Sequence, residues 1–567
     1  MAAGTRPPDD PDDPDDPDRS LVDLALEAPQ ATSIRDEPLA PSLVRTSALV
    51  GLGTALSRLT GFVRLFATGY ALDFARLTDT YTLANTTPNI VYELLLGGVL
   101  SATLVPIFVT HVETDDDEGT SAVISVSAVL LLAITVFGWL AAPLIVDILT
   151  LGVPGAVLAD QQEVATSLLR LFMPQMLFYG LFAMGAALLN ARRRFAAPAF
   201  APVLNNLLVA GVLLLLPTLA GGTPTLGQVR DDPVLLLTLG LGTTAGIAAM
   251  TAALWPSVRR TGARLRFNLD WRNRSVRQVG RLSGWTFGYV LANQVALLVV
   301  LVLASSEDGG VSAYTGAFIF FLLPHALFAV SIMTTLVPEL SACAGRGDMA
   351  GYRSRFSMGL RLMTLVVAPA AIGYVVLAAP IVTALLEHGA LSEEAGTLTG
   401  DVLASFGLGL FGFSVYLYTL RGFYALKDTR TPFFLNLGQN AAQIALCFTL
   451  RPFFGVRGLA LAYGAAYTIF AVVALVVLRN RVGRLEGRRV ARTVAKVGGA
   501  CAVLAVAVLL VAYRVGDGEG LGALVRTAVG VVVGTITYGI AVVALRVEEV
   551  TDLRRRLLRG RSRAPSA

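Results

Sequence analysis

The sequence predicts an all-α polytopic membrane protein with about fourteen transmembrane helices. Apolar residues make up 54% of the 567-residue chain, charged residues only 15%, and the mean hydropathy is +0.66. Long apolar runs alternate with short polar connections, and three segments recur at a nearly constant distance along the chain. We therefore expect two six-helix lobes related by a pseudo-twofold axis along the membrane normal, followed by two extra C-terminal helices.

Each apolar run is long enough to cross a hydrocarbon core of about 30 Å, which takes roughly 20 helical residues. The expected spans are 47–72, 77–110, 121–149, 163–190, 199–219, 234–256, 277–304, 312–341, 356–379, 396–426, 432–450, 455–478, 491–513 and 522–546. An even number of spans places both termini on the same side of the membrane.

The composition divides the chain into five parts. Residues 1–46 carry the run PPDDPDDPDDPD and cannot bury apolar area, so we expect a disordered, acidic, cytosolic tail rich in Pro and Asp. The N-lobe (helices one to six) should occupy 47–256 and the C-lobe (helices seven to twelve) 277–479. Helices thirteen and fourteen should occupy 491–546, and residues 547–567 should form a basic cytosolic tail.

Basic residues gather in every second loop. Lys and Arg lie in the segments 192–194, 259–281, 346–355, 427–430, 479–492 and 554–563. The alternate loops 305–310 and 387–396 contain neither Lys nor Arg. The positive-inside rule then predicts that the N and C termini are both cytoplasmic.

An internal duplication supports the two-lobe arrangement. The matching segments are LAAPLIVDILTLG at 140–152 with LAAPIVTALLEHG at 377–389, ATLVP ending at Pro106 with TTLVP ending at Pro338, and the segments around Asn206 and Asn440. The offsets are 237, 232 and 234 residues. Spans one to six therefore correspond to spans seven to twelve. Because six is even, the two copies share one membrane topology and are not inverted.

The first two spans hold charges where charges are costly. A lipid-facing Arg near the middle of a span costs roughly 2.5 to 3.5 kcal/mol, so such residues usually face a bundle interior or a wet cavity. Arg58 lies about 16 Å inside its apolar run, at the helical rise per residue. Arg64 could instead snorkel to the headgroups, and Asp79 could simply begin the second span at the water interface.

Two guanidinium groups in a cavity suit an anion with several oxygens, because each binds phosphate or carboxylate bidentately. Arg58 and Arg64 are six positions apart, about 240° around a helix. They could hold a large head group at two heights, or one of them could face Asp79.

Other residues of the spans are candidates for gating or ion binding. Pro88 and Pro324 lie inside repeat-matched spans, where proline bends a helix. Glu93 is a candidate for binding a proton or a cation. His325 either bonds a neighbouring helix or relays a proton.

The sequence lacks the signatures of an enzyme or a metal protein. Its three histidines and its three isolated cysteines (Cys343, Cys447 and Cys501) show no metal-ligand spacing, and no nucleophile elbow or phosphate-binding loop occurs. The net charge of +5 comes from arginines in short loops, which does not indicate nucleic-acid binding. We expect a carrier with no cofactor and no metal.

Six segments resemble the MurJ/MviN family, the lipid II flippases of peptidoglycan synthesis within the multidrug/oligosaccharidyl-lipid/polysaccharide (MOP) superfamily. They are SRLTGFVR at 57–64, TDTYTLANTTPN at 78–89, LVPIF at 104–108, LNARRRFAAPAFAPVLNN at 189–206, LPHALFAVSIMTTLVPELS at 323–341 and RGFYALKDTRTP at 421–432. The resemblance covers roughly 47–480.

The resemblance implies alternating-access transport of lipid II, which is undecaprenyl-pyrophosphate-linked disaccharide pentapeptide, from the inner to the outer leaflet of a bacterial cytoplasmic membrane. The family's first-span arginines fall on Arg58 and Arg64, and its second-span aspartate falls on Asp79. We expect Arg58, Arg64, Asp79, Asn89 and Tyr92 to bind the substrate. The resemblance also implies that the extra helix pair forms a membrane-facing groove for the lipid tail. Membrane lipid and proteins of cell-wall synthesis and division are the expected partners.

The chain departs from the Gram-negative pattern at three positions. Tyr92 replaces an arginine of the second span, and Ile319 and Leu322 replace an Arg and a Glu of the eighth. The cavity should therefore be less cationic than in those members. The Arg-rich, Lys-poor composition and the form LPHALFAVS are more similar to the actinobacterial branch.

Three alternatives differ in function. An exporter of another undecaprenyl-linked oligosaccharide would share the fold and the anionic head group. A multidrug or cation antiporter of the same superfamily would need an acidic, aromatic-lined cavity. A non-transporting scaffold for cell-wall enzymes would tolerate neutralisation of Arg58 and Arg64 together.

Overall fold

The computed structural model describes residues 41–94, 104–386, 391–516 and 520–551. The chain divides into Met1–Gly51 and Leu52–Ala567. The first unit is described only from residue 41, as the beginning of helix α2. Most of the expected acidic tail and of the expected basic tail lie outside the described residues.

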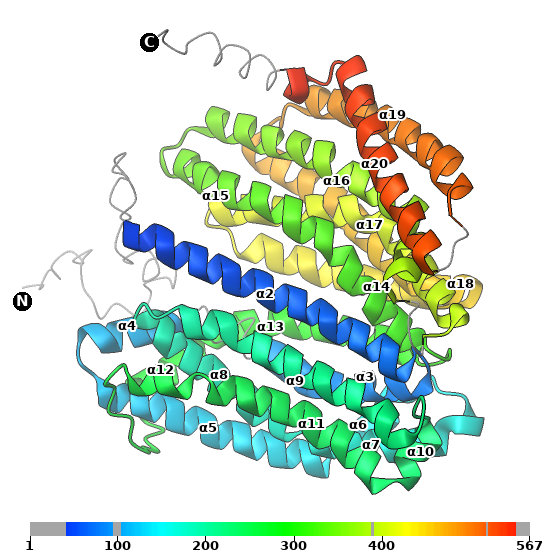
Figure 1. The fold of residues 1–567 in the computed structure, drawn as a ribbon. Coiled ribbons are helices and arrows are strands. Elements are labelled where there is room, and N and C mark those ends of the chain that lie inside the picture. Colours follow the sequence, from blue (N-terminus) through cyan, green and yellow to red (C-terminus); the bar gives the residue numbers. More distant parts are fainter. Residues whose placement is uncertain (1–40, 95–103, 387–390, 517–519, 552–567) are drawn as a thin grey trace, which may run out of the picture. The chain divides into compact units, whose positions relative to one another are not determined.

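The described residues form helices and no strand (Figure 1). The helices up to residue 259, here called the first half, are α2 (Pro41–Leu72), α3 (Arg76–Leu94), α4 (Val105–Glu113), α5 (Asp117–Leu140), α6 (Ala142–Leu149), α7 (Gly155–Phe172), α8 (Pro174–Ala191), α9 (Ala196–Ala220), α10 (Leu226–Asp231), α11 (Pro233–Ala252) and α12 (Trp255–Arg259). The helices from residue 274 onward, the second half, are α13 (Arg274–Ala304), α14 (Gly310–Pro324), the π-turn η2 (His325–Ala329), α15 (Val330–Gly345), α16 (Met349–Leu386), α17 (Glu393–Ala425), α18 (Arg430–Val482), α19 (Gly487–Val511), η3 (Ala512–Arg514) and α20 (Gly520–Ala544).

Within the described ranges, eleven helices are long and apolar enough to cross a membrane. The all-helical fold class is thereby confirmed, whereas the count of fourteen spans stays a prediction. Part of the difference lies in α18, which covers both expected spans 432–450 and 455–478. Gly455 interrupts it with φ +58° and ψ −140°. The Val456 N–H that this bend frees donates to Glu307 Oε1 at 3.1 Å.

Several expected spans are broken rather than continuous. Span 121–149 divides into α5 and α6 at Ala141, and α8 begins at Pro174, immediately after α7. Span 312–341 changes from α-helix to a π-turn directly after Pro324. Proline removes a backbone donor and clashes with the preceding turn, which accounts for breaks at these sites. The expected span 77–110 is described only outside 95–103.

The repeat-matched asparagines have the same structural role in the two halves. Asn206 of α9 donates to the carbonyl oxygen of Ser57 at 3.0 Å and so binds α2, the first helix of its half. Asn440 of α18 donates to Asn293 Oδ1 at 2.8 Å and so binds α13, the first helix of the second half. The duplication seen in the sequence therefore corresponds to a duplicated helix contact.

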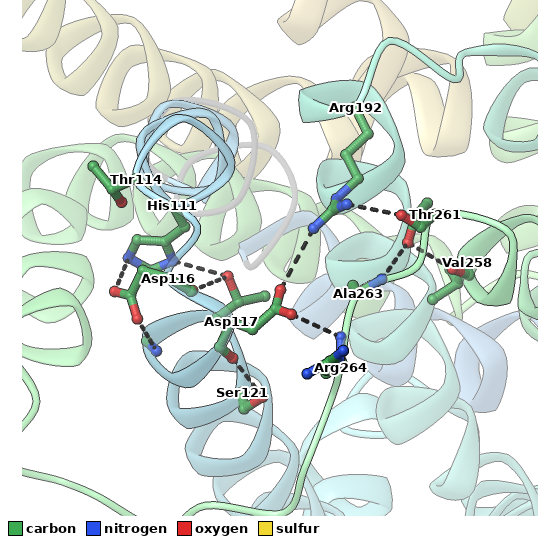
Figure 2. Close-up of polar contacts among 12 residues, drawn as sticks. His111, Thr114, Asp116, Asp117, Ser121, Arg192, Val258, Thr261, Ala263 and Arg264 are labelled. Carbon is green, nitrogen blue, oxygen red and sulfur yellow. Dashed lines mark hydrogen bonds and ion pairs between the residues drawn. The ribbon is translucent and has the colours of Figure 1, made fainter.

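The connection between the halves, residues 260–273, runs along α5 (Figure 2). Acceptors spaced four residues apart on α5 receive alternate backbone N–H groups of the connection: Arg264 N to Asp117 Oδ2 at 2.9 Å, Arg266 N to Ser121 Oγ at 3.1 Å and Asn268 N to Ser125 Oγ at 3.0 Å. Four residues of helix and two of extended chain both advance about 6 to 7 Å, so the two patterns stay in register.

His111 ties the same region to the second half. Its Nδ1 lies 3.0 Å from Thr120 Oγ1 and its Nε2 lies 2.8 Å from Ser275 Oγ, at the start of α13. The side chain is buried. The imidazole therefore bridges the α4–α5 corner to the first helix of the second half.

Helices α19 and α20 pack against each other and against α16. Tyr538 of α20 donates to the carbonyl oxygen of Leu365 at 2.6 Å, and Arg361 of α16 pairs with Glu549 at 2.7 Å. The extra helix pair is thus attached to the second half.

Candidate functional site

Asp79 is fully buried and caps a helix of the other half. Its Oδ1 accepts from the Ser312 backbone N–H at 2.8 Å and from Ser312 Oγ at 2.6 Å, and its Oδ2 accepts from the Val311 N–H at 3.4 Å. Carboxylates are favourable at a helix N-terminus, where backbone N–H groups lack partners and the helix dipole is positive. In this conformation Asp79 joins α3 to α14 and has no surface left for a substrate.

Two further residues near Asp79 in the chain, Arg76 and Asp73, contact the second half. Arg76 donates to the carbonyl oxygen of Ser305 at 3.0 Å and lies 3.4 Å from Asp308 Oδ1. Asp73 Oδ1 accepts from the Ser392 N–H at 3.0 Å. We call Asp73, Arg76 and Asp79 the latch, since each connects the α2–α3 corner to the second half.

Arg58 lies on the side of α2 that faces the second half. The positions Arg58, Phe62 and Leu65 follow the i, i+4, i+7 spacing of one helix face. The Phe62 ring lies 5.8 Å from the Phe320 ring of α14, and Leu65 belongs to the hydrophobic core of the second half. Arg58 is itself exposed, and no described residue forms an ion pair with it.

A different stripe of α2 is apolar and exposed, and it suits contact with lipid. Its members are Leu52, Leu59, Val63 and Tyr70, which are 41 to 60% exposed. Arg58 lies about 100 to 140° around the helix from these four residues, because successive residues turn by about 100°. The Arg58 position therefore belongs to the face of α2 toward the second half and not to the apolar stripe.

Arg64 lies on the third side of α2, one turn beyond Thr60. Thr60 Oγ1 and the Ser57 carbonyl accept from Asn206 of α9, so this side faces the first half. Arg64 is half-buried, and within the described chain no acid pairs with it. Arg58 and Arg64 therefore lie on different sides of α2, as their spacing predicts.

A cavity of about 1130 Å³ opens in the second half. Its wall is mainly apolar and aromatic and includes Tyr289, Met333 and Phe433. Two arginines also line it, Arg421 of α17 and Arg430 of α18. Neither arginine was expected at a site from the sequence, although Arg421 lies inside an expected span, the same feature that marks Arg58.

Aromatic rings position these two arginines. The Arg421 guanidinium carbon lies 5.9 Å from the Tyr424 ring centre, and that of Arg430 lies 5.9 Å from the Phe434 ring centre. Neither arginine forms an ion pair with a described acid. The cavity thus presents two uncompensated positive charges on an apolar, aromatic surface, an arrangement that suits an anionic group linked to a hydrocarbon.

His325 also lines this cavity but is buried, and it bonds the neighbouring helix. Its Nδ1 lies 3.0 Å from Ser414 Oγ of α17, and its ring lies 4.7 Å from the Phe413 ring. Pro324, directly before it, ends α14. The π-turn that follows places the imidazole between helices.

The remaining candidates are not brought together with the arginines by any described contact. Pro88 is buried within α3, and Asn89 donates to the Asn85 carbonyl one turn earlier at 2.9 Å. Glu93 is exposed near the end of α3. The backbone of Tyr92 is helical, and its side chain lies outside the described set.

Comparisons with known proteins agree on one family. The family model described as lipid II flippase MurJ matches residues 70–529. A probable lipid II flippase MurJ from Rhizobium meliloti strain 1021 is 28% identical over 536 residues, covering 92% of this chain and 97% of the relative. The lipid II flippase MurJ of Burkholderia cenocepacia is 26% identical over 473 residues, covering 78% and 84% of the two chains.

Solved structures show the same fold. A lipid II flippase MurJ in an inward closed conformation aligns with a TM-score of 0.71 at 21% identity, covering 88% of this chain and 99% of the other. An inward-facing multidrug resistance MATE family transporter of the MOP superfamily aligns with a TM-score of 0.55 at 14% identity, covering 78% and 95%. Since the family model spans most of the sequence, the chain belongs to the MurJ family of lipid II flippases.

Proposed function

We propose that this protein moves lipid II from the inner to the outer leaflet of a bacterial cytoplasmic membrane by alternating access, with both termini cytoplasmic. Family membership supports the substrate, and the distribution of Arg and Lys among the loops supports the orientation. The single observation that carries the mechanism is the free guanidinium of Arg58 on the face of α2 that contacts the second half.

In this proposal the pyrophosphate binds between the halves. Arg58 and Arg64 contribute from α2, and Arg421 and Arg430 contribute from the cavity of the second half. Guanidinium groups pair bidentately with phosphate oxygens, and they remain charged in a partly apolar site. Arg421 and Arg430 offset the positive charge that Tyr92 and Ile319 lack relative to the Gram-negative pattern.

In this proposal the contacts of the latch form and break during the conformational change. These contacts close one end of the interface between the halves, which the proposed topology places on the outer side. Opening that end breaks the hydrogen bonds of Asp79 and Arg76 to the second half.

A negative-inside potential assists outward movement of the anionic head group by about 2.3 kcal/mol per charge per 100 mV. The extra pair α19–α20 serves the lipid tail, and partners among cell-wall synthesis and division proteins remain a prediction from the resemblance.

The test is complementation of a bacterium depleted of its own flippase, combined with the accessibility of labelled lipid II at the outer leaflet. Arg58→Ala should reach the membrane but fail in both assays. Arg58→Lys should retain part of the activity, because Lys keeps the positive charge but cannot pair bidentately with phosphate oxygens. Arg259→Ala is the matched control, since Arg259 belongs to α12 and lies over the Trp255 ring at 4.9 Å. Full activity of Arg58→Ala would contradict the mechanism.

A further inference from the structure

A second concave site lies in the second half, and none of the four arginines proposed to bind the pyrophosphate lines it. It has a volume of about 530 Å³ and is bordered by α16, the end of α18 and the start of α19. Its apolar wall includes Val472, Val476 and Val494, which are 58, 48 and 40% exposed, and Leu360. We call it the α18–α19 groove. Exposed valines beside a concave surface suit a hydrocarbon chain.

Three arginines line the groove together with these apolar side chains: Arg479, Arg484 and Arg488. All three are exposed, and no described acid pairs with any of them. Other arginines of the same segment are compensated. Arg481 pairs with Asp428, Arg489 with Glu486 at 3.4 Å, and Arg492 with Glu548 at 3.4 Å. The uncompensated charge of this segment is therefore concentrated at the groove.

The backbone around these arginines is held in place. Arg353 of α16 donates to the Val482 carbonyl at 2.8 Å, which satisfies an orphan acceptor at the end of α18. Gly483 follows with φ +89°, a conformation that favours glycine. Leu485 is buried and anchors the connection. The arginines thus extend from a fixed turn and need little ordering to bind an anion.

We propose that the α18–α19 groove binds an anionic phospholipid, with its phosphate on Arg479, Arg484 and Arg488 and its acyl chains along the valines. From Arg479 to Val472 the helix rises about 10 Å, or a third of the hydrocarbon core, so the lipid can stand within its own leaflet. The proposed topology of the transporter makes this the cytoplasmic leaflet. A basic site between helices at that level is typical of anionic lipid recognition.

Two other occupants match the lining less well. A head group made of a disaccharide and a pentapeptide is polar along its length, whereas the groove is apolar apart from its three arginines. Free phosphate would use the arginines but leave the apolar wall without a partner. A phospholipid matches both parts of the groove.

The experiment titrates the purified full-length protein in dodecyl maltoside with dioleoyl phosphatidylglycerol, and with dioleoyl phosphatidylcholine for comparison, and counts bound lipids by native mass spectrometry. Wild type should bind one phosphatidylglycerol more tightly than phosphatidylcholine. The double variant R484Q/R488Q should bind it about 25-fold more weakly, since each basic group near an anionic lipid contributes about fivefold and two of the three are removed.

The matched control is R489Q/R492Q, which removes two charges from the same segment but spares the groove, and it should retain wild-type affinity. V476W fills the groove at unchanged charge and should also weaken binding. Equal losses in the two double variants, or none in R484Q/R488Q, would overturn the proposal. Binding that V476W leaves intact and that millimolar inorganic phosphate displaces would identify a phosphate site instead. Displacement by lipid II alone would assign the groove to the substrate. Because none of these variants alters α2, the complementation assay tests the transport mechanism separately.

Discussion

Ser312 donates both its backbone N–H and its hydroxyl to one oxygen of Asp79, at 2.8 and 2.6 Å, although 233 residues separate the two in sequence. One half of the protein therefore caps a helix of the other half with a buried carboxylate. These hydrogen bonds exist only while the two halves are in contact. They therefore stabilise the closed arrangement relative to an opened one.

Asp79→Asn should weaken this closure. The amide loses the negative charge that the N-terminus of α14 favours, and a hydrogen bond to a charged group is worth about 1.5 to 3 kcal/mol. The population of the opened state should rise about tenfold or more. The rate at which a membrane-impermeant thiol reagent labels a cysteine introduced at Ser306 measures this opening.

Asp232→Asn provides the control for that experiment. Asp232 also caps a helix, accepting from the Val234 N–H at 2.8 Å, but both residues lie in the first half. Its variant should label at the wild-type rate. Equal labelling of Asp79→Asn and wild type would show that the Asp79 cap does not hold the halves together.

Arg76→Gln should also favour opening, and Asp308→Asn should have little effect. The first variant removes both the bond to the Ser305 carbonyl and the ion pair with Asp308. The second removes only the ion pair, whose acid is 65% exposed, and exposed pairs contribute about 0 to 1 kcal/mol. The same labelling assay distinguishes them. A larger effect of Asp308→Asn would reverse this ranking of the two contacts.

Arg421→Gln and Arg430→Gln should each weaken lipid II binding about tenfold while leaving the fold intact. Both side chains line the cavity of the second half without an acid partner. Their loss therefore removes contacts to the pyrophosphate and leaves no buried acid unpaired. Binding of purified lipid II to the protein in detergent measures the change. Arg457→Gln is the control, because Arg457 is already paired with Asp401 at 3.1 Å. Unchanged affinity in both cavity variants would remove these arginines from the proposed site.

Acidification should destabilise the corner that His111 holds. Burial lowers the pKa of His111 below its ordinary value of 6.5, and nearby Asp116 offsets part of that shift. The unfolded chain therefore takes up the proton at a higher pH than the folded one does. The contribution of His111 to the free energy of unfolding is complete above pH 6.5. It declines as the pH falls from 6.5 toward the pKa of His111 in the folded protein.

The melting temperature in detergent at pH 7.5 and 5.5 tests this. His111→Gln cannot titrate, so it should lose less stability between the two pH values than wild type does. An equal decrease in both proteins would assign the pH dependence to other groups.

The sequence by itself determined the features that depend on local composition and periodicity. Long apolar runs predicted the helical class, and the repeat around Asn206 and Asn440 corresponds to a duplicated contact. A charge deep in an apolar run marked Arg58 as a candidate, and its role in transport stays a prediction. The spacing of Arg58 and Arg64 also predicted their different directions. These inferences hold because a helix fixes its own geometry through bonds between near neighbours.

Only the tertiary structure decided which distant groups meet. It placed Asp79 on the N-terminus of α14, His111 beside Ser275, and Arg421 in a cavity with Arg430. A carboxylate at the start of a helix, a lone histidine and an arginine in a span have the same sequence signature whether they face water, lipid or another helix. Their surroundings are set by the packing of helices far apart in the chain, and that packing depends on the sum of many weak contacts that no local pattern records.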